Sequence, residues 1–212
     1  MFYLIGVNHD AQRHPPGAML DKHQTELQLL LNESIEACDP KLIAVEESED
    51  TLFNKRSGVA YESIPRNIAR LHGIDPMLCE PQEDEKAPIG YKNKLEIGLE
   101  LSIARLLDDC PLDLQDAAVL AVEIATMFPL RESFWIDKLK DHLQMEVIFV
   151  LGENHIDSFS CRLQALGVQS KVLFRGIGVA EARIAEFEAA RRFPIENPEL
   201  FCAMLQGIRR KQ

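Results

Sequence analysis

Short apolar runs alternate with helical patterns along most of the chain. The runs with a strand pattern cover residues 2–7, 42–45, 74–79, 147–151 and 171–174. Each is rich in β-prone residues and is bounded by turn residues, which is typical of buried strands. Between them, apolar residues recur at helical spacing, as over residues 21–37 and 64–72. Because strands that alternate with helices form parallel sheets, this order predicts an α/β fold with a mostly parallel, helix-covered sheet of about five strands.

The middle of the chain has a helical pattern throughout. Residues 94–143 are expected to form a helical insertion between the third and fourth strands, and Pro111 and Pro129 are expected to break it into three pieces. Two more helices are expected after the last strand. With 212 residues and no internal repeat, the chain is expected to form one domain over residues 1–212.

Charge and cysteine usage narrow the function classes. Acidic residues outnumber basic ones 34 to 23, giving a net charge of -11, so neither nucleic acid nor an anionic membrane is an expected partner. The five cysteines form no Cys-x-x-Cys pair, which favours reduced thiols. The N-terminal residues lack the basic region of a signal peptide, and no apolar run reaches the roughly 20 residues of a membrane helix. We therefore expect a cytoplasmic protein.

Polar residues follow three of the predicted strands. Two strands run into Gly-x-x-His turns, at Gly6–His9 and Gly152–His155, and a third runs into Glu46 and Glu47. Because ligands of such sheets bind beyond the carboxyl ends of the strands, these residues predict one shared site. Side chains alternate along a strand, so at most one of the two glutamates should face it. We favour Glu46, the first residue after the apolar run.

Two imidazoles and a carboxylate suit a first-row divalent metal such as Mn, Co or Zn, with His9, Glu46 and His155 as ligands. Without a metal, the same set could supply a general base and its orienting group. Asp10 and Glu153, each beside one histidine, are candidates for fixing the histidine tautomers.

Arg131 is expected at a helix start after Pro129, where it could steady an anionic substrate or transition state. The alternative is a surface salt bridge. His14, in the proline-rich loop after His9, could reach the pocket but is otherwise a loop residue. Cys79, at the end of a strand, is interpreted as a buried structural thiol.

These segments together resemble the TraB/GumN/Tiki family. The resemblance rests on both Gly-x-x-His turns, on Val45-Glu46 at a strand end, on Arg131 with Trp135 behind it, on residues 69–74, and on the strand–turn–helix unit over residues 147–167. It implies a fold related to the erythromycin-esterase and haem-binding ChaN-like group. Tiki members are described as metal-dependent proteases that use such histidines and a glutamate. The resemblance thus assigns those roles to His9, His155 and Glu46, with Arg131 as a weaker match.

Three functions stay open at this point. The first is a metal-dependent hydrolase of a peptide, amide or ester bond, with Glu46 or Glu47 as ligand or base. The second is a metal-free hydrolase in which a histidine activates water. The third is a small-molecule, haem or signal-binding module, with His9, His155 or Tyr3 as an axial haem ligand. The expected partner is a small-molecule or peptide substrate, and homo-oligomerisation is left open.

Overall fold

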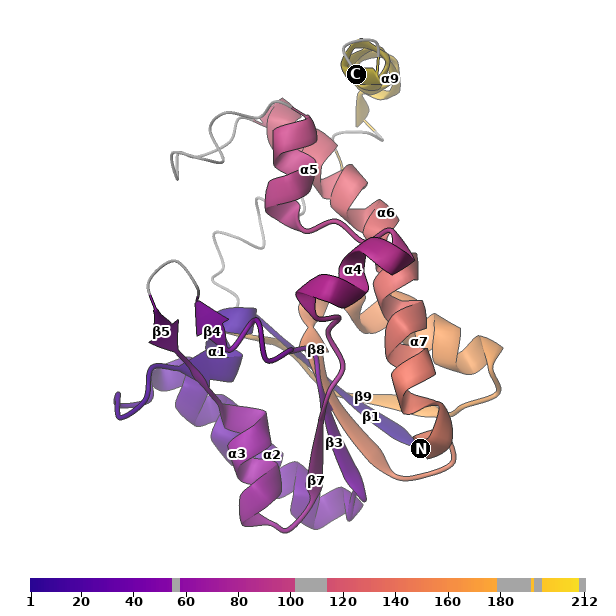
Figure 1. The fold of residues 1–212 in the computed structure, drawn as a ribbon. Coiled ribbons are helices and arrows are strands. Elements are labelled where there is room, and N and C mark those ends of the chain that lie inside the picture. Colours follow the sequence, from indigo (N-terminus) through magenta and orange to yellow (C-terminus); the bar gives the residue numbers. More distant parts are fainter. Residues whose placement is uncertain (55–57, 102–113, 179–191, 193–195, 210–212) are drawn as a thin grey trace. The chain divides into compact units, whose positions relative to one another are not determined.

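The structure is a computed structural model that describes residues 1–54, 58–101, 114–178, 192 and 196–209 (Figure 1). Contacts divide the chain into two compact units. The first unit comprises residues 1–86 and 131–179, and the second comprises residues 87–130 and 180–212. All of the residues predicted to form the site belong to the first unit.

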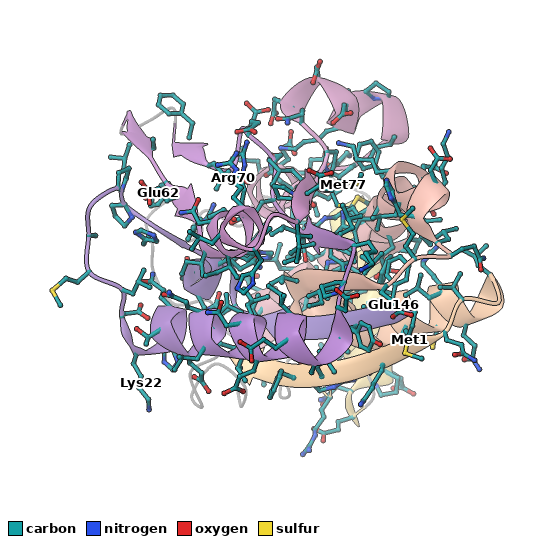
Figure 2. All side chains as sticks on the ribbon, turned by 90° about the horizontal axis from the view of Figure 1, so that it is seen from below. Met1, Lys22, Glu62, Arg70, Met77 and Glu146 are labelled. Carbon is teal, nitrogen blue, oxygen red and sulfur yellow. The ribbon has the colours of Figure 1, made fainter. Side chains whose placement is uncertain are left out.

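The first unit contains the five-stranded sheet. Its strands are β1 (Phe2–Val7), β3 (Leu42–Val45), β7 (Asp75–Leu78), β8 (Val147–Gly152) and β9 (Ser170–Ile177). They lie in the order β7-β3-β8-β1-β9, and every pair is parallel. The register sets Phe2 opposite Val147. Figure 2 shows Met1 and Glu146 beside each other just before these strands, where the Met1 ammonium lies 3.6 Å from Glu146 Oε1. The predicted parallel α/β fold is confirmed.

Helices cover the sheet within the first unit (Figure 1). They are α1 (His9–Gln12), α2 (Lys22–Cys38), α3 (Ile64–Leu71), α7 (Ile156–Ala165) and, from residue 131 onward, α6 (Leu114–Leu139). The 3-10 turn η2 (Lys140–His142) follows α6, and η3 (Glu153–His155) precedes α7. α2 begins at a capping box between Asp21 and Gln24, and Ser63 caps α3. These local signals explain why both helices start where the sequence pattern places them.

Alternation along the strands separates two apolar cores. Leu42 and Ala44 of β3 pack with residues of α7 and with Trp135, whereas Ile43 and Val45 pack with α2 and α3. The two sets occupy opposite faces of the sheet because successive strand side chains point in opposite directions. The two glutamates that follow β3 continue this alternation.

The predicted helical insertion lies between β7 and β8. It contains α4 (Glu83–Ile89), α5 (Lys94–Glu100) and α6 (Leu114–Leu139), and α9 (Pro198–Arg209) follows later in the chain. The prediction of a break at Pro129 is wrong, because α6 continues through it. One proline removes one backbone hydrogen bond. Buried residues before it, such as Leu120, and after it, such as Trp135, hold α6 on both sides. Pro111 and the other expected C-terminal helix lie outside the described residues.

Two small ribbons were not expected from the sequence. β2 (Arg13–His14) pairs with β6 (Glu62–Ser63), and β4 (Phe53–Asn54) pairs with β5 (Val59–Ala60), in both cases antiparallel. Two-residue strands are too short to show a period of two. The segment interpreted as a loop before Pro15 therefore begins with paired backbone.

Candidate functional site

The carboxyl ends of three adjacent strands meet at Glu46. Its side chain is fully buried, and its carboxylate accepts a hydrogen bond from the Gly152 amide at the end of β8. Its own amide donates to the Val150 carbonyl at 2.9 Å. The turn after β1 adds His9, whose Nε2 lies 3.5 Å from Glu46 Oε1, and the turn after β8 adds His155, whose Nε2 lies 3.8 Å from the same oxygen. The structure thus brings the two histidines and Glu46 together.

Arg131 occupies the centre of this cluster. Its NH1 donates to His155 Nε2 at 3.0 Å, and its NH2 donates to Glu80 Oε2 at 2.7 Å and to Glu46 Oε1. Its guanidinium carbon lies 5.3 Å from the Trp135 ring centre, a cation–π distance. Only 12% of the side chain is exposed. Arg131 therefore lies inside α6 as a buried charge, and neither the helix start nor the surface salt bridge describes it.

His155 is held from its other side by Glu132. Nδ1 donates to Glu132 Oε1 at 2.9 Å, and Ser158 Oγ donates to the same oxygen. The other carboxylate oxygen accepts from Arg162 Nε at 2.7 Å. Glu153, the expected partner of His155, instead accepts from the Gly176 amide at 2.8 Å. The side chain adjacent in sequence thus points to β9, while one from α6 takes its place.

His9 is held more loosely than His155. Nearly half of its side chain, 46%, is exposed, against 3% for His155. Its Nδ1 lies 3.4 Å from Gln12 Nε2, so Gln12 takes the position expected for Asp10. With contacts of 3.4 and 3.5 Å, both ring nitrogens have only weak hydrogen-bond partners. His9 is therefore the group of this cluster with room to act on a molecule from solvent.

The two turn glycines make room for side chains of the opposite turn. A Cβ on Gly6 would overlap the Glu153 carboxylate and lie 3.0 Å from Ile156 Cγ1. A Cβ on Gly152 would lie 3.1 Å from Glu46 Oε2 and 3.2 Å from His9 Nε2. Glycine is favoured at both positions because a methyl group there would displace the ends of these side chains.

The two glutamates after β3 lie in opposite environments. Burial by itself raises the pKa of Glu46, but Arg131, the two histidines and the Gly152 amide outweigh it and lower that pKa to about 2. Burial raises the pKa of Glu47 to about 7, although Ser63, Arg13 and Arg66 oppose it. Ser63 is near Glu47, yet neither Glu47 oxygen has a hydrogen-bond partner of good geometry among the described residues. Glu46 is thus a stable carboxylate of the site, and the sequence-based choice between the two agrees with this geometry.

The donor atoms predicted to bind a metal face Arg131. Glu46 Oε1 and His155 Nε2 both accept hydrogen bonds from its guanidinium. Within the described residues, no group of three or more His, Cys, Asp or Glu side chains has the arrangement of a metal site. The cluster does not fit a metal ion while Arg131 stands there. Arg131 engages Nε2 of His155 and Glu132 engages Nδ1, so His9 is the histidine of the cluster that is left as a candidate haem ligand. Tyr3, the other candidate, lies at the start of β1 beside Glu146 and Cys38, apart from the cluster.

Two carboxylates of the cluster were missed from the sequence. Glu80 follows the third strand just as Glu46 follows the second, so its position was a readable signal. Glu132 follows Arg131, and its partners Ser158 and Arg162 stand three and seven residues after His155, on one face of a helix. Neither the adjacency of Arg131 and Glu132 nor the helical spacing of Ser158 and Arg162 could predict that α6 packs against α7.

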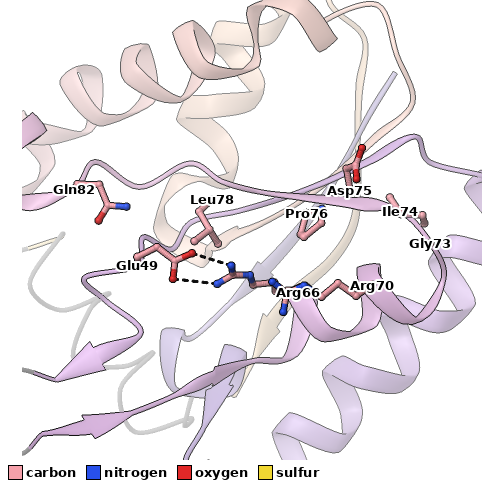
Figure 3. Close-up of a pocket in the computed structure, with 9 residues that line it drawn as sticks. All are labelled: Glu49, Arg66, Arg70, Gly73, Ile74, Asp75, Pro76, Leu78 and Gln82. Carbon is pink, nitrogen blue, oxygen red and sulfur yellow. Dashed lines mark hydrogen bonds and ion pairs between the residues drawn. The ribbon is translucent and has the colours of Figure 1, made fainter.

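A groove of about 620 Å³ lies along the edge strand β7 (Figure 3). Its lining includes Glu49, Arg66, Arg70, Pro76, Leu78 and Gln82. Arg66 and Glu49 form an ion pair across it. No residue of the histidine cluster lines this groove.

Two other candidates from the sequence lie outside the cluster's hydrogen bonds. His14 Nε2 lies 3.7 Å from Glu62 Oε2, in the small ribbon of β2 and β6. Burial raises the pKa of the Cys79 thiol to about 12, as suits a structural cysteine.

Comparisons with protein-family models, with curated proteins and with solved structures gave no match. Among the described residues, no helix combines the length and the apolar character needed to cross a membrane. The geometry of the cluster is therefore the basis for a functional proposal.

Proposed function

We propose that this chain is a cytoplasmic hydrolase of the erythromycin-esterase kind, which cleaves an ester, amide or peptide bond with His9 as general base and needs no metal ion. One observation carries the proposal: the Arg131 guanidinium, which Glu80 and His155 also hold, donates to Glu46 Oε1, the same oxygen that lies 3.5 Å from Nε2 of the half-exposed His9. A fixed positive charge beside an accessible base is the pairing that hydrolysis of a carbonyl compound requires.

In this reaction His9 takes a proton from a water molecule as the water oxygen bonds to the substrate carbonyl carbon. The π electrons of the carbonyl move to its oxygen, which becomes an oxyanion. When the bond to the leaving oxygen or nitrogen breaks, the oxyanion regains its double bond and His9 returns the proton to the leaving group. The products are a carboxylic acid and an alcohol or amine.

The charged neighbours have complementary roles in this scheme. Arg131 supplies positive charge for the oxyanion, in a site where burial reduces screening by solvent. Glu46, 3.5 Å from His9, pairs with the positive charge that the imidazole gains. The lowered pKa of Glu46 keeps it ionised for this purpose at any physiological pH.

A divalent metal site is the second candidate. The specific observation in its favour is the Glu132–His155 bond, because histidines that ligate metals usually donate their other ring nitrogen to a carboxylate. The Nε2 atoms of His9 and His155 also lie 3.5 and 3.8 Å from the same oxygen, Glu46 Oε1. His9, Glu46 and His155 would hold the ion after Arg131 has left its acceptors.

The test combines metal analysis with hydrolysis. The purified protein is assayed against a panel of activated esters, anilides and peptides, with and without chelator, and its metal content is measured by mass spectrometry. Metal-independent turnover that His9→Ala abolishes supports the proposal. His23→Ala is the matched control, because 48% of the His23 side chain is exposed, close to the value for His9. Turnover lost to chelator, with about one ion per chain, would establish the second candidate instead.

A further inference from the structure

The Glu132 cluster, defined as Glu132, Ser158 and Arg162, lies behind His155 and has no part in the reaction scheme above. Glu132 is fully buried and carries three hydrogen bonds, from His155 Nδ1, Ser158 Oγ and Arg162 Nε. A buried carboxylate is costly unless its oxygens are satisfied, and here both are. The three hydrogen bonds therefore suggest that Glu132 has a role in the site in addition to filling space.

The bonds on the two sides of His155 determine where its proton lies. An ionised carboxylate can only accept a hydrogen bond, so the 2.9 Å contact with Glu132 requires a proton on Nδ1. A guanidinium can only donate, so the 3.0 Å contact with Arg131 NH1 requires a lone pair on Nε2. Only the neutral Nδ1–H tautomer meets both requirements.

We propose that Glu132 is a positioning residue of this site: it fixes His155 as the neutral Nδ1–H tautomer, so that the Nε2 lone pair holds the guanidinium of Arg131. His155 then acts as the third acceptor of Arg131, beside Glu46 and Glu80, and takes no part in proton transfer. Its ring is further restrained by Trp135, whose ring centre lies 4.8 Å away in an edge-on arrangement.

Ser158 and Arg162 hold Glu132 in turn. Both residues belong to α7, which begins directly after His155. One helix therefore orients the histidine as well as the carboxylate that accepts its hydrogen bond. Arg162 also donates to Ser133 Oγ at 3.1 Å, which ties α7 to the next residue of α6. The carboxylate is thus held between two helices of the same unit, and its oxygens have little freedom to turn away from Nδ1.

The catalytic consequence rests on the proposed function, but the tautomer is measurable without a substrate. Protein labelled with ¹⁵N-histidine is examined by long-range ¹H–¹⁵N NMR at neutral pH, and His155 is assigned by the signals lost in His155→Gln. We expect a protonated Nδ1 and an unprotonated Nε2 in the wild type. Signals from two protonated nitrogens, or from a protonated Nε2 alone, would overturn the proposal whatever the protein hydrolyses.

Two variants separate positioning from simple packing. Glu132→Gln keeps an acceptor oxygen, expected on the side where His155 and Ser158 both donate, so the Nδ1–H tautomer should persist. Glu132→Leu has similar length and no acceptor, so only the contact with Arg131 then favours the Nδ1–H tautomer, and a population with the proton on Nε2 should appear. Ser158→Ala is the control, since it removes one contact with Oε1 and leaves the acceptor in place. An unchanged tautomer in folded Glu132→Leu would overturn the proposal, as would a shift in Ser158→Ala.

If Glu132→Leu does not fold, the wild-type spectrum and Glu132→Gln still decide the matter, because a Glu132→Gln protein with the Nε2–H tautomer contradicts the proposal. Once a substrate is known, Glu132→Leu should lower kcat about 10- to 100-fold with little change in KM, and Glu132→Gln should restore most of it. A tautomer result as expected, combined with no hydrolysis of any substrate, would remove the proposed function and leave the positioning role intact.

Discussion

The two faces of the sheet treat neighbouring glutamates in opposite ways. On the face of α7 and Trp135, Glu46 is surrounded by Arg131, two histidines and a backbone amide, and its pKa falls to about 2. On the face of α2 and α3, burial raises the pKa of Glu47 to about 7, and its carboxyl oxygens have no hydrogen-bond partner of good geometry among the described residues. Burial is similar on the two sides, so the difference comes from the partners.

The contrast assigns different consequences to the two glutamates: Glu46 bears on the candidate site, and Glu47 bears on the stability of the fold. A carboxylate that stays ionised inside the protein can organise positive charge, as Glu46 does for Arg131 and His9. A carboxyl that costs free energy to ionise makes the folded state depend on pH, as is expected of Glu47. The predictions below test the two faces, from the largest expected effect to the smallest.

Removing the central cation should have the largest effect. Arg131→Met leaves Glu46 and Glu80 buried without their shared partner, which should lower the free energy of unfolding by about 3–5 kcal/mol. Urea unfolding followed by circular dichroism measures this. Arg175→Met is the control, because 45% of Arg175 is exposed and the loss of its ion pair with Asp157 should cost less than about 1 kcal/mol. Equal losses of stability in the two variants would mean that the buried ion pairs of Arg131 contribute no more than the exposed ion pair of Arg175.

Glu47 should dominate a pH effect on the other face. Its pKa is raised from 4.5 to about 7, so the folded state favours the protonated form. Stability from this group is therefore present below pH 4.5 and is lost as the pH rises toward 7, by up to about 3 kcal/mol. Glu46 has the opposite dependence: its pKa is lowered to about 2, so its stabilisation is complete well above pH 4.5 and is lost as the pH falls toward 2. Glu47→Gln should remove this fall in the free energy of unfolding with pH, and it should be more stable than the wild type at pH 8. Urea unfolding across the pH range measures both effects. Parallel curves for the two proteins would contradict the raised pKa.

The two histidines should separate stability from activity. His155→Ala removes a fully buried ring and leaves Glu132 and Arg131 each without one partner, so we expect a loss of about 2–3 kcal/mol. His9→Ala removes a half-exposed ring with long contacts and should cost less than about 1 kcal/mol. Thermal unfolding of the two variants gives the comparison, and both should lose hydrolysis. A His9→Ala protein as unstable as His155→Ala would show that His9 is a structural residue.

The smallest effect is expected at the first turn. Gly6→Ala pushes a methyl group against Glu153 and Ile156 and should cost about 1 kcal/mol, because the carboxylate end can shift. Glu153→Ala makes space, so the double variant should lose less than the sum of the two single losses. Chemical unfolding of all four proteins measures this coupling energy. Strict additivity would mean that the two side chains do not compete for the space.

Much of the fold could be predicted from local pattern. The central strands β1, β3 and β8 have continuous apolar runs, and the helix over residues 22–38 has a capping pair and regular spacing, so local and tertiary preferences agree. Pro129 was misread because local propensity gives way when buried residues on both sides hold one helix together. The two-residue ribbons carry no period that could have revealed them.

The candidate site was predictable where it depends on strand ends. His9, Glu46 and His155 follow strands that become neighbours, so a general rule for parallel sheets placed them together. The role of Glu132 depends on how α6 packs against α7, through partners 26 and 30 positions away. The central position of Arg131 depends on contacts with His155, 24 positions away, and with Glu46, 85 positions away. Nothing in the local sequence specifies such contacts, and the nearer acidic neighbours, Asp10 and Glu153, were the natural wrong choices.

Each turn glycine leaves space for a side chain of the opposite turn, and this limits which substitutions can accumulate during evolution. Since Gly6 makes room for Glu153, while Gly152 makes room for Glu46 and His9, neither turn can drift alone. In related chains, a larger residue at position 6 should occur only beside a shorter one at position 153. A larger residue at position 152 should likewise occur only where position 9 or 46 carries a smaller side chain.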